Sequence, residues 1–178
     1  AKERQMESIA TSDPLTGVLN RRGFERGAAK RLTESDDHAT GALLFIDLND
    51  FKAINDKFGH EIGDQLLKIA AERLRQSLRS CDIIGRPGGD EFVALVPDVD
   101  ADVADKLAKR LTGALEQPYN IGRHRLFCAA SIGLALYPEN ASTLTGLLRE
   151  ADQAMYRAKA RCRGVANISG DDLLEKAM

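Results

Sequence analysis

Residues Gly41 to Leu48 form a continuous apolar run with one charged member, Asp47, next to its end. Strands with one face in water alternate apolar and polar residues, whereas a continuous apolar run of this length indicates a strand buried on both faces. Such a strand lies in the centre of a sheet that is covered on both sides. The run therefore predicts an α/β sandwich built around it.

Other segments of the chain supply the covering helices and the neighbouring strands. Apolar residues at helical spacing predict helices over 21–32, 62–78, 101–115 and 144–158. Short strands are expected at 83–84 and 92–96, and most of 126–137 reads as strand. Residues 34–40 form a polar loop in this interpretation. Strands and helices alternate, with one hairpin, so we expect a mixed sheet flanked by helices.

Length, charge and cysteine usage exclude several classes of protein. The 178 residues suit one ordinary domain with short appendages, and no apolar stretch is long enough to cross a bilayer. The net charge of −2 gives no overall basic field, so no nucleic acid polymer is expected as a partner. The cysteines are odd in number and widely spaced, which fits neither a disulfide framework nor a zinc site: Cys81, Cys128 and Cys162. A reducing cytoplasm is the expected location, and any membrane anchor of a parent protein would lie outside this chain.

A glycine turn followed by two acids lies between two apolar runs. Gly88 and Gly89 have no side chains to block the backbone, so a bulky ligand can approach it closely. Asp90 and Glu91 follow at once, and with Asp47 they form an acid set able to hold a divalent cation. Side chains alternate along a strand, so we expect only one of the two hairpin acids to share a face with Asp47. The combination predicts chemistry on a nucleotide phosphate.

Each of these residues also has a simpler interpretation. An isolated Asp at a strand end most often caps the next turn, two glycines can form a plain hairpin, and Glu91 can be a solvated strand residue.

The segment after Asp47 adds phosphate- and base-binding candidates. Residues 49–52 form a polar turn whose backbone amides can hold phosphate oxygens, with Lys52 adding positive charge. Asn55 and Asp64 together can recognise the edge of guanine, because a carboxylate accepts from its N1–H and amino group. Taken singly, they are a helix cap and a solvated acid of a first helical turn. His60, between them, is not assigned a catalytic role.

Four polar residues of the last predicted helix recur at helical spacing. They are expected to share the face opposite the apolar stripe: Asp152, Tyr156, Lys159 and Arg163. On that face Lys159 and Arg163 can reach one polyanion together. The alternative is a solvated charged face.

Five motifs in register now give the chain a family resemblance. It resembles the GGDEF family of bacterial diguanylate cyclases over about 150 residues. The matching segments are an N-terminal motif at 13–21, a nucleotide-binding segment at 47–64, the signature at 86–92, and a closing pattern at 131–133 and 151–159.

The resemblance implies a fold and a reaction. The fold is a mainly antiparallel sheet flanked by helices, related to class III nucleotide cyclases and polymerase palms. The reaction condenses two GTP into cyclic di-GMP and two pyrophosphates across a homodimer, in which each protomer holds one GTP. It requires Mg²⁺ or Mn²⁺, two ions per active site, to activate the attacking hydroxyl and neutralise the leaving group.

The resemblance also implies roles for particular residues. Asp47, the Leu48 carbonyl and Asp90 would bind the metal, and Glu91 would be a further metal or outer partner. The substrate-binding residues would be Phe51, Lys52, Asn55, Asp64, Gly88, Gly89, Lys159 and Arg163. Asp90 is the candidate to take the proton of the attacking hydroxyl.

A second, inhibitory site is expected before the signature. Arg79 and Asp82 form an RxxD pattern, which in family members binds the product cyclic di-GMP. Arginine can stack on guanine and bind its O6/N7 edge, while the carboxylate accepts from N1–H. Arg110 is a candidate to complete this pocket from a neighbouring chain. The alternative is a salt bridge at a helix end.

The resemblance finally suggests a domain layout and leaves two functions open. Residues 1–12 would end an upstream signalling helix, 13–168 would form the catalytic domain, and 169–178 would be a tail or connector. An upstream sensor domain and a downstream EAL phosphodiesterase domain are expected in the parent protein. The alternative to an active cyclase is a non-catalytic module that binds GTP or cyclic di-GMP and regulates an attached domain.

Overall fold

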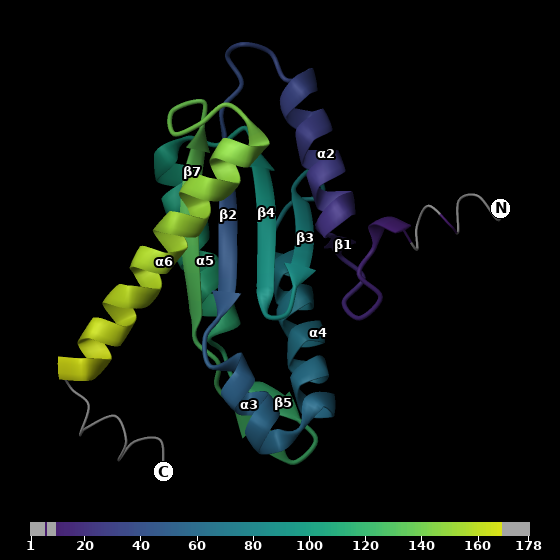
Figure 1. Ribbon diagram of the computed structural model, residues 1–178, viewed down its shortest axis with the longest axis vertical. Helices are drawn as coiled ribbons and strands as arrows, with labels where there is room; N and C mark the ends of the chain where they lie inside the picture. Colours follow the sequence, from purple (N-terminus) through teal and green to yellow (C-terminus); the bar gives the residue numbers. More distant parts are fainter. Residues whose placement is uncertain (1–5, 7–9, 169–178) are drawn as a thin grey trace.

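A five-stranded sheet forms the centre of the molecule (Figure 1). The computed structural model describes residue 6 and residues 10–168, with side chains as far as residue 161. The strand order is β1-β3-β4-β2-β7; β1 runs parallel to β3 and the other neighbours are antiparallel. These strands are β1 (Leu19–Asn20), β2 (Gly41–Leu48), β3 (Ile83–Gly88), β4 (Glu91–Pro97) and β7 (Ala130–Tyr137). The predicted mixed, mainly antiparallel sheet is confirmed.

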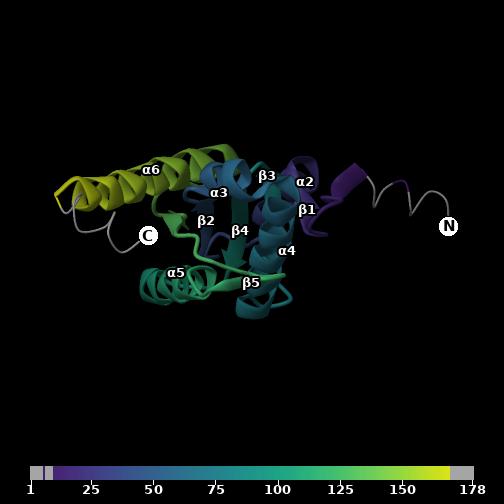
Figure 2. The same ribbon diagram turned by 90° about the horizontal axis from the view of Figure 1, so that it is seen from below.

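Helices cover both faces of this sheet (Figure 2). On one face lie α4 (His60–Ser77) and α5 (Ala101–Leu115), which share a large apolar core with the sheet. On the other face lie α2 (Arg21–Glu34) and α6 (Leu144–Ile168), over a smaller core. The result is the expected α/β sandwich, with no membrane-crossing helix among the described residues.

Strand β2 is central because its residues supply both cores. Leu44 and Ile46 belong to the core under α4 and α5, whereas Leu43 belongs to the core under α2 and α6. All three side chains are fully buried. By the same alternation, Asp47 lies on the α2/α6 face.

A close approach of α6 to β7 fixes the position of this helix. A Cβ atom at Gly133 of β7 would lie 1.9 Å from the carbonyl oxygen of Ala151 in α6. Only glycine permits this contact, so α6 packs directly on the strand next to β2.

The predicted elements agree with the structure apart from the following differences. The helix α3 (Phe51–Phe58) was not predicted, because its eight residues are too few for a clear helical period. The hairpin of β5 (Tyr119–Ile121) and β6 (His124–Leu126) was also missed, and residues 127–129 interrupt the strand expected over 126–137. The polar loop begins at Ser35, since Glu34 still belongs to α2. Most of residues 1–12, expected to end an upstream helix, and all of the tail at 169–178 lie outside the described residues.

Candidate active site

Three carboxylates gather at one end of the β2–β4 pair, and we call Asp47, Asp90 and Glu91 the acidic edge. Asp47 of β2 lies directly opposite Glu91, the first residue of β4. Side chains of directly paired residues point to the same face, so both lie on the α2/α6 side. Asp90 lies in the tight turn before β4, and its carbonyl oxygen accepts a hydrogen bond from the backbone N–H of Leu48 at 3.1 Å.

The prediction that only one hairpin acid shares a strand face with Asp47 holds for Glu91, which is paired directly with Asp47. It assumed that Asp90 and Glu91 both belong to a strand, whereas Asp90 lies in the turn, where side chains do not alternate. Besides burial, the charge of Asp47 raises the pKa of Asp90 and that of Glu91, so Asp47 lies near both. All three acids therefore form one electrostatic group.

The acidic edge carries more negative charge than its surroundings balance. Burial, and then the charge of Asp47, raise the pKa of Asp90 above the ordinary value of an aspartate. Burial and the charges of Asp47, Asp90 and Asp152 likewise raise the pKa of Glu91. Lys159 is the cation that offsets these effects. An uncompensated group of carboxylates of this kind fits a divalent cation.

Lys159 contacts the acidic edge directly. Its Nζ lies 2.6 Å from Oδ2 of Asp47, whose side chain is only 7% exposed. The prediction that Lys159 lies opposite the apolar stripe of its helix is wrong, because it continues the row of Ala151 and Met155, both buried, at four-residue spacing. Asp152 is exposed, and Tyr156 is 70% exposed. The side chain of Arg163 lies outside the described part.

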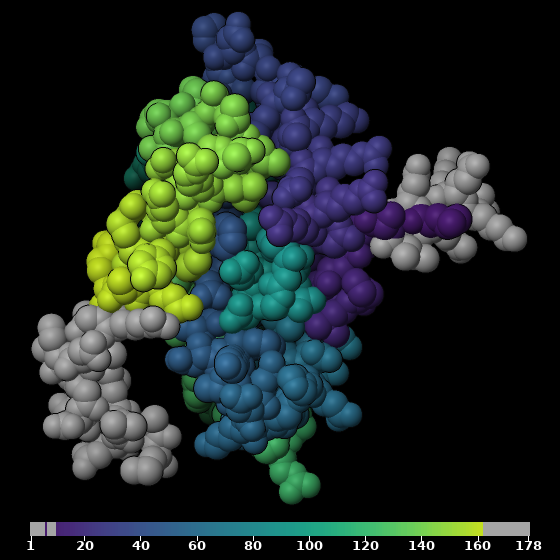
Figure 3. All heavy atoms as spheres, viewed as in Figure 1, coloured from purple at the N-terminus to yellow at the C-terminus, as the bar shows by residue number. Residues whose placement is uncertain are grey.

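The glycine turn is open to a ligand. Gly88 ends β3, and Gly89 occupies the turn with a φ of 53°, a left-handed conformation that favours glycine. A Cβ atom at either position would meet nothing within 4 Å. In Figure 3 the teal hairpin is exposed between the yellow-green α6 and the violet-blue α2.

An ion pair that local sequence reasoning missed holds this hairpin in place. The guanidinium of Arg86 donates to Asp13 at 3.0 Å and to the carbonyl oxygen of Gly89 at 2.9 Å. Burial raises the pKa of Asp13, but the hydrogen bonds from Thr16 and the partner Arg86 outweigh this, so the pKa lies below its ordinary value. The side chains of Asp13 and Arg86 are 13% and 15% exposed, respectively, and no periodic pattern in the sequence links the two residues.

The turn after Asp47 leads into the N-terminus of α3. Asp50 has a φ of 63°, rare for a residue other than glycine, and its side chain makes no capping hydrogen bond. The first N–H groups of α3 therefore have no side-chain cap, which is the arrangement that binds anions. Phe51 is buried and Lys52 is exposed beside it. Phosphate binding at this turn stays a prediction.

The guanine-reading candidates lie on α3 and α4. Asn55 approaches Gly63 so closely that a Cβ atom there would lie 1.7 Å from Oδ1 of Asn55. That Oδ1 is buried and has no hydrogen-bond partner. Asp64, next to Gly63, is exposed. The structure therefore places an unpaired amide oxygen close to the residue that precedes Asp64. His60 is exposed.

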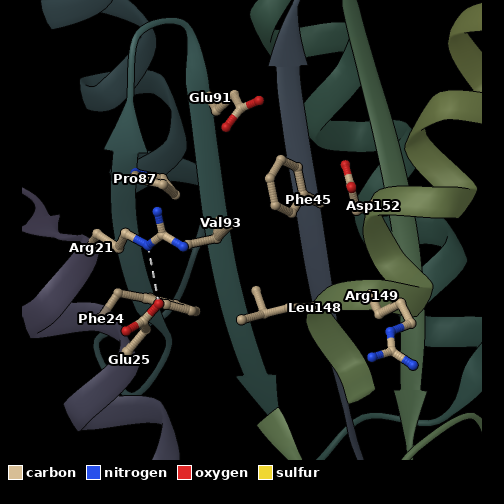
Figure 4. Close-up of a pocket in the computed structure, with 10 residues that line it drawn as sticks. All are labelled: Arg21, Phe24, Glu25, Phe45, Pro87, Glu91, Val93, Leu148, Arg149 and Asp152. Carbon is tan, nitrogen blue, oxygen red and sulfur yellow. Dashed lines mark hydrogen bonds and ion pairs between the residues drawn. The ribbon is translucent and has the colours of Figure 1, made fainter. Parts of the chain in front are cut away.

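A cavity of about 380 Å³ borders the acidic edge on the α2/α6 face (Figure 4). Phe45, Val93 and Leu148 form its apolar floor, and Glu91 and Asp152 lie on its rim. Because Glu91 belongs to both, the cavity and the acidic edge are continuous.

The RxxD residues line a separate cavity of about 460 Å³ beside α5. The Asp82 carboxylate accepts from the backbone N–H of Arg79 at 2.7 Å and from its guanidinium at 3.2 Å. Arg79 also donates to the carbonyl oxygen of Pro97 at 2.6 Å. Arg110 lines the cavity from the same chain and donates to the carbonyl oxygen of Ser77, so a neighbouring chain is not needed to bring it there.

The cation site implied by the sequence rests on few side chains. In the described part of the chain, no group of three or more His, Cys, Asp or Glu side chains is arranged to hold a metal ion. The predicted site instead combines the carboxylates of Asp47 and Asp90 with the carbonyl of Leu48. Hard oxygen donors of this kind suit Mg²⁺, which keeps several waters and binds few carboxylates.

Acids at the ends of two interior strands, an open glycine turn and an uncapped helix N-terminus suit a class of domain that acts on a nucleotide phosphate. The sequence pattern described as "Diguanylate cyclase, GGDEF domain" matches residues 10–164. The chain therefore belongs to the GGDEF family.

Relatives and solved structures agree with this assignment. The chain is 42% identical over 161 residues to the bifunctional diguanylate cyclase/cyclic di-GMP phosphodiesterase MucR of Pseudomonas aeruginosa, covering 90% of this chain and 24% of MucR. It is 40% identical to the diguanylate cyclase TpbB of the same species, covering 90% of this chain and 38% of TpbB. A structure of the TpbB GGDEF domain superimposes with a TM-score of 0.81 at 38% identity, covering 84% of this chain and 89% of that one. The chain thus spans well under half the length of these curated relatives.

Proposed function

We propose that this domain condenses two molecules of GTP into cyclic di-GMP and releases two pyrophosphates. The observation that carries the proposal is the acidic edge, where Asp47, Asp90 and Glu91 converge beside an open glycine turn. Three acids with one lysine among them are costly to a fold unless they bind a cation. A GGDEF domain that served only as a scaffold would not need this charge.

In the proposed reaction, the chain orients GTP by its two ends. Asn55 and Asp64 bind guanine, since the unpaired Oδ1 of Asn55 needs a donor and Asp64 is free to accept from N1–H and the amino group. The N-terminus of α3 with Lys52, and Lys159 with Arg163 on α6, hold the phosphates. Phe51, Gly88 and Gly89 shape the space between the two ends.

The acidic edge performs the proton chemistry. Asp47, Asp90 and the Leu48 carbonyl would hold Mg²⁺ or Mn²⁺, two ions per site, which would lower the pKa of the attacking 3′-hydroxyl and neutralise the leaving pyrophosphate. Asp90 takes the proton of that hydroxyl, since its carboxylate lies in the open glycine turn beside Asp47, where the hydroxyl would be held. Glu91, whose pKa is raised, supports Asp90 from the neighbouring position.

Two proposed features concern regulation and assembly. One GTP per protomer makes the active unit a homodimer with facing sites, so specific activity should rise with protein concentration. The cavity beside α5 would bind cyclic di-GMP as a product inhibitor. It is lined by a carboxylate and two guanidiniums, those of Asp82, Arg79 and Arg110.

The domain is proposed to act within a longer protein, because MucR and TpbB extend well beyond the matched part. We infer an upstream sensor domain joined through residues 1–12, a catalytic domain over 13–168, and a tail or connector over 169–178, with an EAL domain downstream in the parent protein.

The test is incubation of the protein with GTP and Mg²⁺, followed by chromatographic separation of the nucleotides. Cyclic di-GMP and pyrophosphate should form with the parent and with Asp37→Asn, a matched control in an exposed loop. Neither should form without metal. GTP binding without product, persisting when the protein is forced to dimerise, would replace the cyclase by a nucleotide-binding regulatory module.

A further inference from the structure

Asn49 lies two residues after Asp47, and its polar groups are bonded within the chain with one exception. Its backbone N–H donates to the carbonyl oxygen of Ala129 at 2.7 Å, and its own carbonyl oxygen accepts from the thiol of Cys128 at 3.1 Å. The side-chain Nδ2 donates to Oγ of Ser131 at 2.8 Å. The remaining atom, Oδ1, is buried and has no partner. A buried acceptor without a donor destabilises a fold, so it calls for an explanation.

The partner Ser131 places this amide beside the acidic edge. Ser131 of β7 is directly paired with Asp47 of β2, so the two side chains point to the same face and start within about 5 Å of each other. Ser131 is only 3% exposed. In the strand order β4-β2-β7, Asp47 therefore has Glu91 on one side and Ser131, which holds Asn49, on the other.

The chemistry of an unpaired acceptor limits what it can bind. An amide oxygen takes a hydrogen-bond donor or a cation, and it repels the acceptor oxygens of a phosphate. Beside two carboxylates that are proposed to hold a divalent cation, the matching partner is the cation or a water molecule bound to it. A neutral oxygen there adds a ligand or an outer contact without adding to the repulsion between the acids.

We propose that Asn49 is a further oxygen group of the cation site, with Ser131 as the residue that fixes the orientation of its amide. The inference rests on the proposed function, since it adds to the cation site of Asp47 and Asp90. It assigns the β7 side of Asp47 to cation binding, whereas Glu91 of β4 and Asp90 in the turn before it lie on the other side.

The test measures Mn²⁺ binding to the full chain by electron paramagnetic resonance, without nucleotide and without any reading of activity. Asn49→Leu should weaken binding roughly tenfold, the lower end of the effect of groups that orient metal ligands. Asn49→Asp should restore or exceed the parent affinity, because it keeps the acceptor and the Ser131 hydroxyl can turn to donate to it. Ser131→Ala should weaken binding less than Asn49→Leu, and Ser131→Thr, which keeps the hydroxyl, should bind as the parent does.

Controls separate the possible failures. Asn120→Asp adds the same charge at an exposed position of β5 and should leave Mn²⁺ affinity unchanged. Asp47→Asn should abolish binding; if it does not, the proposed cation site itself is wrong. If Asp47→Asn abolishes binding while Asn49→Leu and Asn49→Ala bind Mn²⁺ as tightly as the parent, the role of Asn49 is overturned and its amide serves the fold alone. The Tm of each variant, with and without Mn²⁺, shows whether a variant that binds poorly is still folded.

Discussion

The acidic edge and the RxxD corner, defined by Arg79 and Asp82, use charged residues in opposite ways. In the RxxD corner the Asp82 side chain is 1% exposed and is matched by a backbone N–H and a guanidinium of Arg79. At the acidic edge, Asp47, Asp90 and Glu91 share one lysine, and burial together with the charge of Asp47 raises the pKa of Asp90 and of Glu91. One group is balanced within the chain and the other is not.

This difference separates stability from function. A buried carboxylate whose partners are all present contributes to the fold, and its loss should be felt on unfolding. A carboxylate held beside like charges opposes the fold, so its presence is explained by something that it binds. Substitutions at the two sites should therefore move activity and stability independently.

The largest effect is expected at the acidic edge. Asp90→Asn should lower turnover by at least about a thousandfold, because it removes both a cation ligand and the proposed proton acceptor. Its Tm should equal or exceed that of the parent, since the neutral amide relieves repulsion from Asp47. Turnover is measured by chromatography and Tm by calorimetry, with Asp37→Asn as the control. Parent turnover in Asp90→Asn would remove Asp90 from the site.

The next effect sharpens the contrast at the RxxD corner. Arg79→Ala should leave initial turnover intact but weaken inhibition by added cyclic di-GMP by roughly tenfold to a hundredfold, the range expected for losing a guanidinium that binds guanine. The measurement is the inhibition constant for cyclic di-GMP. Arg123→Ala, at an exposed turn between β5 and β6, is the matched control. Inhibition that persists unchanged in Arg79→Ala would leave the RxxD pair with a structural role only.

The sequence alone predicted the parts of this contrast that are local. The continuous run in β2 and the glycine turn are short-range patterns, so the central strand and the hairpin acids followed from them. The pairs that complete the sites are not local: Asn49 and Ser131 are 82 residues apart, and Asp13 and Arg86 are 73 apart. No periodicity indicates which distant residues meet. The helix face on which Lys159 lies was wrongly predicted for a related reason. Lys159 is at the border of the apolar stripe of its helix, and its contact with the distant Asp47 decides where its side chain points.

A stability effect without a direct effect on chemistry is expected from Asp82→Asn. The amide cannot match both donors of Arg79, so unfolding free energy should fall by about 2 kcal/mol, close to a 30-fold change in the unfolding equilibrium. Denaturant titration measures it. Asp105→Asn, which breaks an exposed pair with Lys109 on α5, should cost less than about 0.5 kcal/mol. An equally small loss in Asp82→Asn would mean that this corner does not stabilise the fold.

The smallest effect concerns the ion pair behind the signature hairpin, and its sign depends on pH. The pKa of Asp13 lies below its ordinary value, so its charged form stabilises the fold above about pH 4, and that contribution is lost as pH falls through the folded pKa. Asp13→Asn should therefore unfold more easily than the parent at pH 7, by about 1 kcal/mol, and the difference should shrink as pH approaches 3. Denaturant titrations at both pH values measure the gap, with Asp37→Asn as the control. A gap that stayed constant would attribute the loss to packing. A gap that closes would show that the ion pair with Arg86 holds the hairpin on which the unbalanced acids lie.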